Sequence, residues 1–467
     1  MTDLSTINLS MQLMLVIWLV AVFRIVRHSI AEGSVGLPAA LVLAMTFLYG
    51  GCFVYAVPGY THLRVDGNPV LLRYAFSEWT VVQGTFASLL GILGFALGTG
   101  VFRKHRSAPH KVRPAARAPE RKILLLLGGI GVVGFLIHYV DLTFPMSSSL
   151  NELGRNIGIV AICLGSYLAW RDGKPLAPWF CLASLVPLYY FVLFGFASYG
   201  LLFGIIFGSF WLATLKRRRE HGLLPKALLG LAGTWVTLTA FVGWFSFRDQ
   251  FRDVIWAGEG GSILPILSKA IAKTELFSPW NFASLDLVNI RLNLPLFIGK
   301  MIERHTLYPD LKEHGATLIN LPFAILPRFL WPDKPERGGS GFMSEHTGIA
   351  LSESATFGTG TVFEFYINFG YLGVFIGFIL LGWIIRRVDS AASKYLLQGK
   401  LFDFARLFLV GIVAIDPLLR PFFIVNGAVL AWILMTILKI SFVRLIGNSR
   451  PRPDLRVAHP RKSHSRL

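Results

Sequence analysis

The residue types suited to chemistry are concentrated in residues 320–373, a polar stretch in an otherwise apolar chain. Prolines at several positions forbid one continuous helix there and stiffen the path of the chain. Charged groups at a boundary between water and lipid are costly, so they are usually retained for a site or to hold a fold. The candidate residues of this stretch are Arg328, Asp333, Lys334, Arg337, His346, Glu364 and Asn368.

Arginines in and before this stretch are suited to binding phosphate, because a guanidinium is always charged and grips phosphate oxygens through two parallel hydrogen bonds. Arg248 and Arg252 lie four residues apart and would share one side of a helix. With Arg328 they are our first candidates for binding a lipid-linked diphosphate and stabilising it as a leaving group. Further candidates are Arg291, Lys334, Arg337 and Arg420. The alternative is that they pair with nearby acids, such as Asp416 beside Arg420, and only fasten the chain.

If the group released by the diphosphate is transferred to a hydroxyl, that hydroxyl needs a base to remove its proton. Glu364 is the first candidate for this base. We expect it in the first turn of a membrane span, where the helix dipole favours a carboxylate, and a purely structural acid there is an equally good interpretation. Asp333 and His346 are the second choices, and Asn368 lies one turn beyond Glu364 on the same face. His305 and His346 are isolated in the sequence, where a packing role is the commoner one.

Other catalytic patterns are missing from the sequence. It contains no GxSxG, Walker loop, HExxH, EF-hand or DxD pattern, so we expect a reaction without a metal or other cofactor. The three cysteines, Cys52, Cys163 and Cys181, fall in apolar runs and form no CxxC pair. They predict neither a disulfide framework nor a zinc site.

The elements that must position these residues are membrane helices, because apolar residues make up 54% of the chain and its mean hydropathy is +0.58. We predict an all-α polytopic membrane protein with about eleven spans, an outside N-terminus and a cytoplasmic C-terminus. The first span reads as a retained helix rather than a cleaved signal. The expected spans are 9–26, 37–57, 79–102, 123–141, 155–170, 176–194, 198–215, 227–247, 362–385, 402–419 and 421–443.

Four regions follow from this pattern. Spans one to eight occupy residues 1–247, a large extracytoplasmic loop occupies 248–361, spans nine to eleven occupy 362–445, and a basic cytoplasmic tail occupies 446–467. Within the loop, the apolar spacing of 262–277 and 283–303 predicts amphipathic helices on the membrane surface or capping the bundle.

The net charge of +19 raises the possibility of nucleic-acid binding, so its distribution matters. The basic clusters at 103–122, 216–220, 384–389 and 450–467 all fall on the predicted cytoplasmic side. This is the positive-inside pattern of a membrane protein. We therefore interpret them as topology anchors near anionic lipid and expect no nucleic-acid partner.

The run LPRFLWPDKP (326–335), together with EFYINFGYLGVFIGFILLG (364–382), resembles the oligosaccharide repeat-unit polymerases, the Wzy-type O-antigen polymerases of bacterial envelopes. The resemblance implies a multi-pass glycosyltransferase of the bacterial inner membrane with its active site facing the periplasm. It would join undecaprenyl-diphosphate-linked oligosaccharides in O-antigen (lipopolysaccharide), capsule or exopolysaccharide synthesis. The bilayer, a chain-length regulator and a flippase are the implied partners. Arg328, Asp333, Lys334, Glu364 and Asn368 match the family pattern by position.

Three other interpretations remain open. One is an O-antigen ligase or another transferase that uses the same lipid-linked donors. The others are a lipid-linked glycan transporter and an envelope assembly protein. A transporter is expected to have broken spans and charges near the midplane. The sequence predicts unbroken spans with charges at their outer edge, which favours an enzyme.

Overall fold

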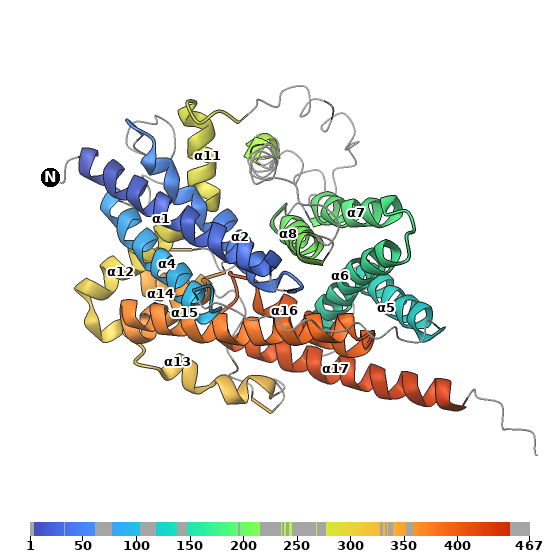
Figure 1. Ribbon diagram of the computed structural model, residues 1–467. Coiled ribbons are helices and arrows are strands. Elements are labelled where there is room, and N and C mark those ends of the chain that lie inside the picture. The colour runs from blue at the N-terminus through green and yellow to red at the C-terminus, as the bar shows by residue number, and fades with distance from the viewer. Residues whose placement is uncertain are drawn as a thin grey trace, which may run out of the picture.

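The computed structural model describes residues 4–31, 33–60, 77–102, 118–137, 147–194, 197–214, 277–326, 340–351 and 358–448, with a few single residues between these ranges. Every long regular element in the described ranges is a helix, and most of these helices run alongside one another as a bundle (Figure 1). The prediction of an all-α polytopic membrane protein is confirmed at this level.

Six described helical segments are long and apolar enough to cross a membrane. They are α1 (Leu4–Ala31), α2 (Leu37–Tyr49) with the 3₁₀ helix η1 (Gly50–Ala56), α4 (Glu78–Gly98), α6 (Ser147–Arg171), α15 (Gly360–Leu397) and α17 (Pro421–Asn448). Each coincides with a predicted span. The total of eleven spans and the orientation of the chain stay predictions.

Four more helices occupy predicted spans and are not among these six. They are α5 (Ala118–Leu136), α7 (Ala177–Phe194), α8 (Ala197–Thr214) and α16 (Leu401–Ala414). α7 ends at Phe194 and α8 begins at Ala197, so the two helices are divided where the spans 176–194 and 198–215 were predicted to be. The predicted span 227–247 and the segment 262–277 lie almost entirely outside the described residues.

The central contacts are made by α4, whose glycines let two other helices approach its backbone. A Cβ atom built on Gly84 would lie 1.8 Å from the carbonyl oxygen of Pro295, and one on Gly299 would lie 1.7 Å from that of Thr80. α12 (Leu294–Leu307) therefore packs against α4 with almost no side chain between them. On another face of α4, a Cβ on Gly94 would lie 2.4 Å from the carbonyl oxygen of Phe375 in α15. Such small residues are common where membrane helices meet.

The predicted amphipathic segment 283–303 forms α11 (Phe282–Leu292) and α12. Asn293 separates them, and its side-chain oxygen accepts a hydrogen bond from the N–H of Leu296 at 3.1 Å, which caps α12. The two helices are bent by 60° and are together apolar enough to count as a seventh, broken span. α12 buries one face against the bundle.

The rest of the described loop is built from short helices. They are η4 (Pro309–Leu311), α13 (Ala316–Ile319), η5 (Leu321–Ile325) and α14 (Ser340–Thr347). Pro309 begins η4 and Pro322 is the second residue of η5, positions where a missing N–H costs nothing. η4 and α14 lie beside α12, α13 lies beside α15 and α17, and η5 lies beside α17.

The expectation of unbroken spans is wrong at α15. Phe369 (φ −141°, ψ 17°) and Gly370 (φ 63°, ψ −154°) are not helical, so α15 consists of two helical parts. Gly370 has a positive φ that side-chain-bearing residues rarely adopt, which explains why the break falls at a glycine. The second part runs to Leu397, beyond the predicted end at 385, and carries the basic cluster 384–389 within it.

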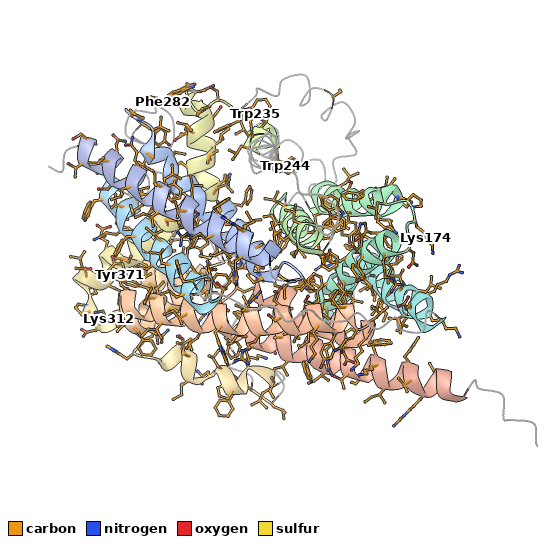
Figure 2. The ribbon with its side chains drawn as sticks, viewed as in Figure 1. Lys174, Trp235, Trp244, Phe282, Lys312 and Tyr371 are labelled. Carbon is orange, nitrogen blue, oxygen red and sulfur yellow. The ribbon has the colours of Figure 1, made fainter. Side chains whose placement is uncertain are left out.

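A separate group of helices, α5, α6 and α7, lies at one edge of the bundle (Figure 1). Gly131 and Gly158 bring α5 and α6 into backbone contact, because a Cβ on Gly131 would lie 2.3 Å from Cα of Gly158. Two hydrogen bonds of 2.9 and 2.7 Å from Arg171 to Glu120 join the same helices at one end. Lys174 follows in an exposed turn at the outer edge (Figure 2).

Candidate functional site

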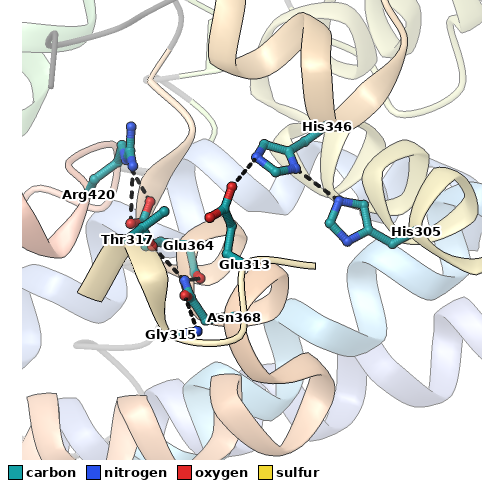
Figure 3. A network of polar contacts seen from close by, with 8 residues as sticks. All are labelled: His305, Glu313, Gly315, Thr317, His346, Glu364, Asn368 and Arg420. Carbon is teal, nitrogen blue, oxygen red and sulfur yellow. Dashed lines mark hydrogen bonds and ion pairs between the residues drawn. The ribbon is translucent and has the colours of Figure 1, made fainter. Parts of the chain in front are cut away.

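A cluster of polar side chains gathers where α12, α13, α14, α15 and the start of α17 meet (Figure 3). These segments are far apart in the sequence, and their contributions are mostly buried. The cluster consists of the side chains of His305, Glu313, Thr317, His346, Glu364, Asn368 and Arg420 and the backbone N–H of Gly315.

The strongest interaction is a two-point ion pair between Glu364 and Arg420. Nε of Arg420 donates to Oε2 of Glu364 at 2.6 Å, and Nη2 donates to Oε1 at 3.2 Å. Glu364 is fully buried, the side chain of Arg420 is 11% exposed, and the guanidinium carbon lies 3.8 Å from the centre of the Phe342 ring. Both carboxylate oxygens are thus engaged, so the pair joins α15 to the start of α17.

Asn368 holds the loop before α13 against α15. Its Oδ1 accepts from the N–H of Gly315 at 2.9 Å, and its Nδ2 donates to the hydroxyl of Thr317 at 2.7 Å. Nδ2 also donates to the carbonyl oxygen of Glu364 at 2.7 Å, which confirms that the two residues lie one helical turn apart on one face. Asn368 is therefore a positioning residue for the loop that carries Glu313.

The break in α15 supplies a further anchor for Glu313. In a continuous helix the carbonyl oxygen of Ile367 would accept from the N–H of residue 371. Here it accepts from the N–H of Glu313 at 3.0 Å. The irregular backbone at Phe369 and Gly370 thus allows the α12–α13 loop to dock on the helix.

Glu313 and two histidines form a linear arrangement. Nε2 of His346 lies 3.6 Å from Oε1 of Glu313, and Nδ1 of His346 is hydrogen bonded to Nε2 of His305 at 3.0 Å. Both histidines are almost fully buried, whereas the side chain of Glu313 is 27% exposed. Within the described part of the chain, Nδ1 of His305 has no hydrogen-bond partner. The row therefore runs from an accessible carboxyl group to a buried ring nitrogen.

Burial and nearby charges adjust the acidities in this row. Burial raises the pKa of Glu313, and the negative charges of Glu345 and Glu364 raise it further. Arg420 acts in the opposite direction. Burial first, and then the neighbouring His305, Arg420 and Arg304, lower the pKa of His346 to about 4. At neutral pH the His346 ring is therefore uncharged, and Glu313 holds a proton more readily than an ordinary glutamate does.

A second cation, Arg304, lies beside the cluster. It precedes His305 in the last turn of α12, and its Nη1 would lie 2.5 Å from a Cβ placed on Gly348, a residue with φ of 72°. Its guanidinium carbon lies 5.5 Å from the ring centre of Tyr308. Because residue 348 is a glycine, the space that a side chain would fill there is occupied by the Arg304 guanidinium.

The structure brings four predicted site residues together: His346, Glu364, Asn368 and Arg420. The alternative pairing of Arg420 with Asp416 is not formed, because Arg420 pairs with Glu364 and Asp416 accepts from the N–H of Leu418 at 3.0 Å. Of the other predicted residues, Arg248, Arg252, Arg328, Asp333 and Arg337 lie outside the described residues.

Arg291 and Lys334 lie apart from this cluster. Arg291 is exposed at the end of α11. Lys334 donates to the carbonyl oxygens of Ala324 and Leu326 at 2.7 and 2.9 Å, and it lies 3.5 Å from Oδ1 of Asn426. Lys334 is therefore held against the end of η5 and the first part of α17.

Sequence reasoning missed Glu313 and the pairing of the two histidines. His305 and His346 are 41 residues apart, on different short helices, and no motif spacing links them. The nearest signal was the Glu-His-Gly triplet at 313–315 in a loop between predicted helices, because a glycine there permits the turn that Asn368 binds.

Comparison of the chain with protein-family models, curated proteins and solved structures finds no match in any of the three. The class of protein is therefore defined by the fold alone: an all-helical, multi-span membrane protein. In the described ranges, no group of three or more His, Cys, Asp or Glu side chains is arranged to hold a metal ion.

Proposed function

We propose that this protein is a polymerase of undecaprenyl-diphosphate-linked oligosaccharides at the outer face of a bacterial inner membrane. The observation that carries the proposal is the Glu313–His346–His305 row beside the Glu364–Arg420 pair at one end of a membrane bundle. A carboxyl group with an adjusted pKa beside fixed cations suits a transfer that removes a proton from one group and builds negative charge on another. The motif resemblance around 326–335 and 364–382 supplies the substrate class.

We assign the base to Glu313 in preference to Glu364. Both oxygens of Glu364 are engaged by Arg420 and the residue is fully buried, so an acceptor hydroxyl cannot approach it without breaking the pair. Glu313 is partly exposed, and its raised pKa brings it closer to the pH at which it acts. Glu364 then acts as a positioning residue that holds Arg420 in place.

The proposed reaction transfers a glycosyl group from the diphosphate to the acceptor hydroxyl. The acceptor hydroxyl gives its proton to Glu313 as its oxygen bonds to the anomeric carbon of the donor. The bond from that carbon to the diphosphate breaks, and its electron pair leaves with the diphosphate. Arg304, beside the cluster, would stabilise that negative charge, together with the sequence candidates Arg248, Arg252 and Arg328. Glu313 is partly exposed and releases the proton to water, while His346, with its pKa lowered to about 4, stays neutral beside it.

The test uses a strain in which variants replace the normal gene and lipid-linked glycans are sized by gel and mass spectrometry. Glu313→Gln is expected to collapse the ladder to one repeat unit, with a loss of about 100-fold or more in polymer yield. Lys312→Gln, at the neighbouring exposed position, is the matched control and should leave the ladder intact. A normal ladder from well-expressed Glu313→Gln would contradict the assignment.

One observation favours a second function, a lipid-linked glycan transporter. The break at Phe369 and Gly370 lies beside the polar cluster, and discontinuous helices are common at transporter binding sites. In the same assay, a transporter variant would trap repeat units on the inner leaflet, whereas a ligase variant would leave full-length polymer unattached. Only single units exposed on the outer leaflet agree with a polymerase.

A further inference from the structure

The group of α5, α6 and α7 encloses a cavity of about 560 Å³. Its wall is almost entirely apolar and includes Leu124, Val132, Trp179 and Leu185. This volume falls within the roughly 300–1,000 Å³ of typical small-molecule pockets. None of its lining residues belongs to the polar cluster around Glu313, so the cavity is a separate feature.

Glycines create this space. A Cβ atom placed on Gly128 or Gly129 of α5 would meet no atom within 4 Å, so these positions face open room. On the opposite wall, the Trp179 ring lies against Gly165, where a Cβ would come within 2.1 Å of it. Larger side chains at Gly128 or Gly129 would occupy the cavity without displacing its walls.

The cavity opens sideways to the membrane. Leu125, Val132 and Leu185 line it and are more than half exposed, at 66%, 58% and 55%. Apolar side chains exposed on a membrane bundle face lipid tails. The surroundings of the opening are therefore hydrocarbon, and an apolar cavity excludes water.

Its two ends differ in character. Arg121 lines one end, and Lys122 beside it is also exposed. The neighbouring Arg171 is paired with Glu120, so that acid is already engaged by another cation. At the other end Tyr189 donates to the carbonyl oxygen of Phe135 at 2.6 Å and closes the wall. A ligand with an anionic head at the Arg121 end and an apolar body matches this pattern.

The length and volume of the cavity indicate what the apolar part of the ligand is. Arg121 and Phe135 are separated by about 21 Å of helix, at about 1.5 Å per residue. Half of a bilayer core is about 15 Å, so a tail from one leaflet would fit along this path. A second helix of that length and about 10 Å diameter would need about 1,600 Å³, far more than the cavity offers.

We propose that this cavity binds one acyl chain of an anionic phospholipid, with its head group on Arg121 and Lys122. The positive-inside prediction for 103–122 would place that lipid in the inner leaflet. The site would fix α5 to α7 through the lipid, at a distance from the polar cluster. The proposal does not depend on the glycan substrate proposed above.

The test uses the full-length protein in phosphatidylcholine vesicles that contain phosphatidylglycerol with a photoactivatable acyl chain. After illumination, labelled peptides are mapped by mass spectrometry. Labelling is expected on α5, α6 and α7, and a phosphatidylcholine probe should label them about fivefold less. Equal labelling by both probes, or labelling spread over all spans, would overturn the proposal.

Variants localise the site. Gly128→Leu should abolish this labelling, because leucine fills the cavity and also favours the helix. Gly204→Leu is the matched control, since a Cβ at that position of α8 also meets no atom within 4 Å, and it should keep the wild-type labelling. Arg121→Gln, at an exposed position, should lower labelling by phosphatidylglycerol about fivefold and leave the phosphatidylcholine signal unchanged. Unchanged labelling in Gly128→Leu and Arg121→Gln would also overturn it.

Discussion

At the scale of single residues, the site contains the Glu364–Arg420 ion pair and the Glu313–His346–His305 row, and the two have different physical roles. Glu364 and Arg420 cancel each other's charge and join two elements, whereas Glu313, beside the two histidines, is the base in the reaction that we propose. A buried ion pair contributes little relative to apolar residues of the same shape, but its loss on one side leaves an unpaired charge. This distinction separates stability from activity in mutational experiments.

Arg420→Met is expected to destabilise the protein by about 3–5 kcal/mol, because it leaves the Glu364 carboxylate buried without a partner. The double variant Arg420→Met with Glu364→Met should recover most of that loss. Thermal unfolding in detergent, followed by fluorescence, measures both. Lys174→Met is the control, because its pair with Asp172 is long at 3.8 Å and exposed, and its effect should be under about 1 kcal/mol. Equal losses in the single and double variants would show that the pair is not the cause.

The lowered pKa of His346 predicts a pH dependence of stability. Its pKa is about 4 in the folded protein and 6.5 in the unfolded chain, so the unfolded state binds more protons between these values. The contribution of neutral His346 is therefore complete above about pH 6.5 and is lost as pH falls towards 4. The full loss is on the order of 2–3 kcal/mol. Glu313, with its raised pKa, acts in the opposite direction as pH rises above about 4.5.

Melting temperatures of wild type and His346→Asn, measured in detergent from pH 4 to 7.5, test this effect. The melting temperature of the wild type should exceed that of His346→Asn at pH 7.5, and this difference should shrink as the pH falls from about 6.5 to 4. His314→Asn is the control, because this neighbouring histidine is exposed and its φ of 46° is one that asparagine tolerates. A gap between wild type and His346→Asn that stays constant with pH would refute the assignment.

At the scale of elements, the break in α15 is the feature that joins the membrane bundle to the loop. It frees the Ile367 carbonyl oxygen for Glu313 and leaves Asn368 directed at Gly315. Its sequence, Asn-Phe-Gly, contained the glycine, but the surrounding apolar run indicated one uninterrupted span. The hydropathy of the segment could not predict this break, because the carbonyl oxygen that it frees is bonded by a loop more than fifty residues earlier in the chain.

Gly370→Ala tests the importance of this break. An alanine there would meet no atom within 4 Å, so its cost of about 1–3 kcal/mol would come from backbone strain at φ of 63°. We expect a lower melting temperature and a shorter glycan ladder, because Glu313 loses its anchor. Gly341→Ala in α14 also meets no atom and should be close to neutral. Wild-type ladders and stability in Gly370→Ala would show that the break is not required.

At the scale of the whole molecule, composition and apolar runs predicted the class and the positions of the long helices. The site was predicted in part: Glu364, Asn368, Arg420 and His346 do lie together. Glu313 was missed, because its role arises from contacts between distant segments rather than from its neighbours in the chain. α16 is shorter than its predicted span and α15 is longer, so the apolar run locates a helix but does not determine where it ends.

The backbone contact between α4 and α12 at Gly84 and Gly299 has a mechanical consequence. With no side chain between their backbones at this point, the two helices are held together as one rigid unit. His305, in the last turn of α12, belongs to that unit, so the position of its ring is fixed by the contact between α12 and α4.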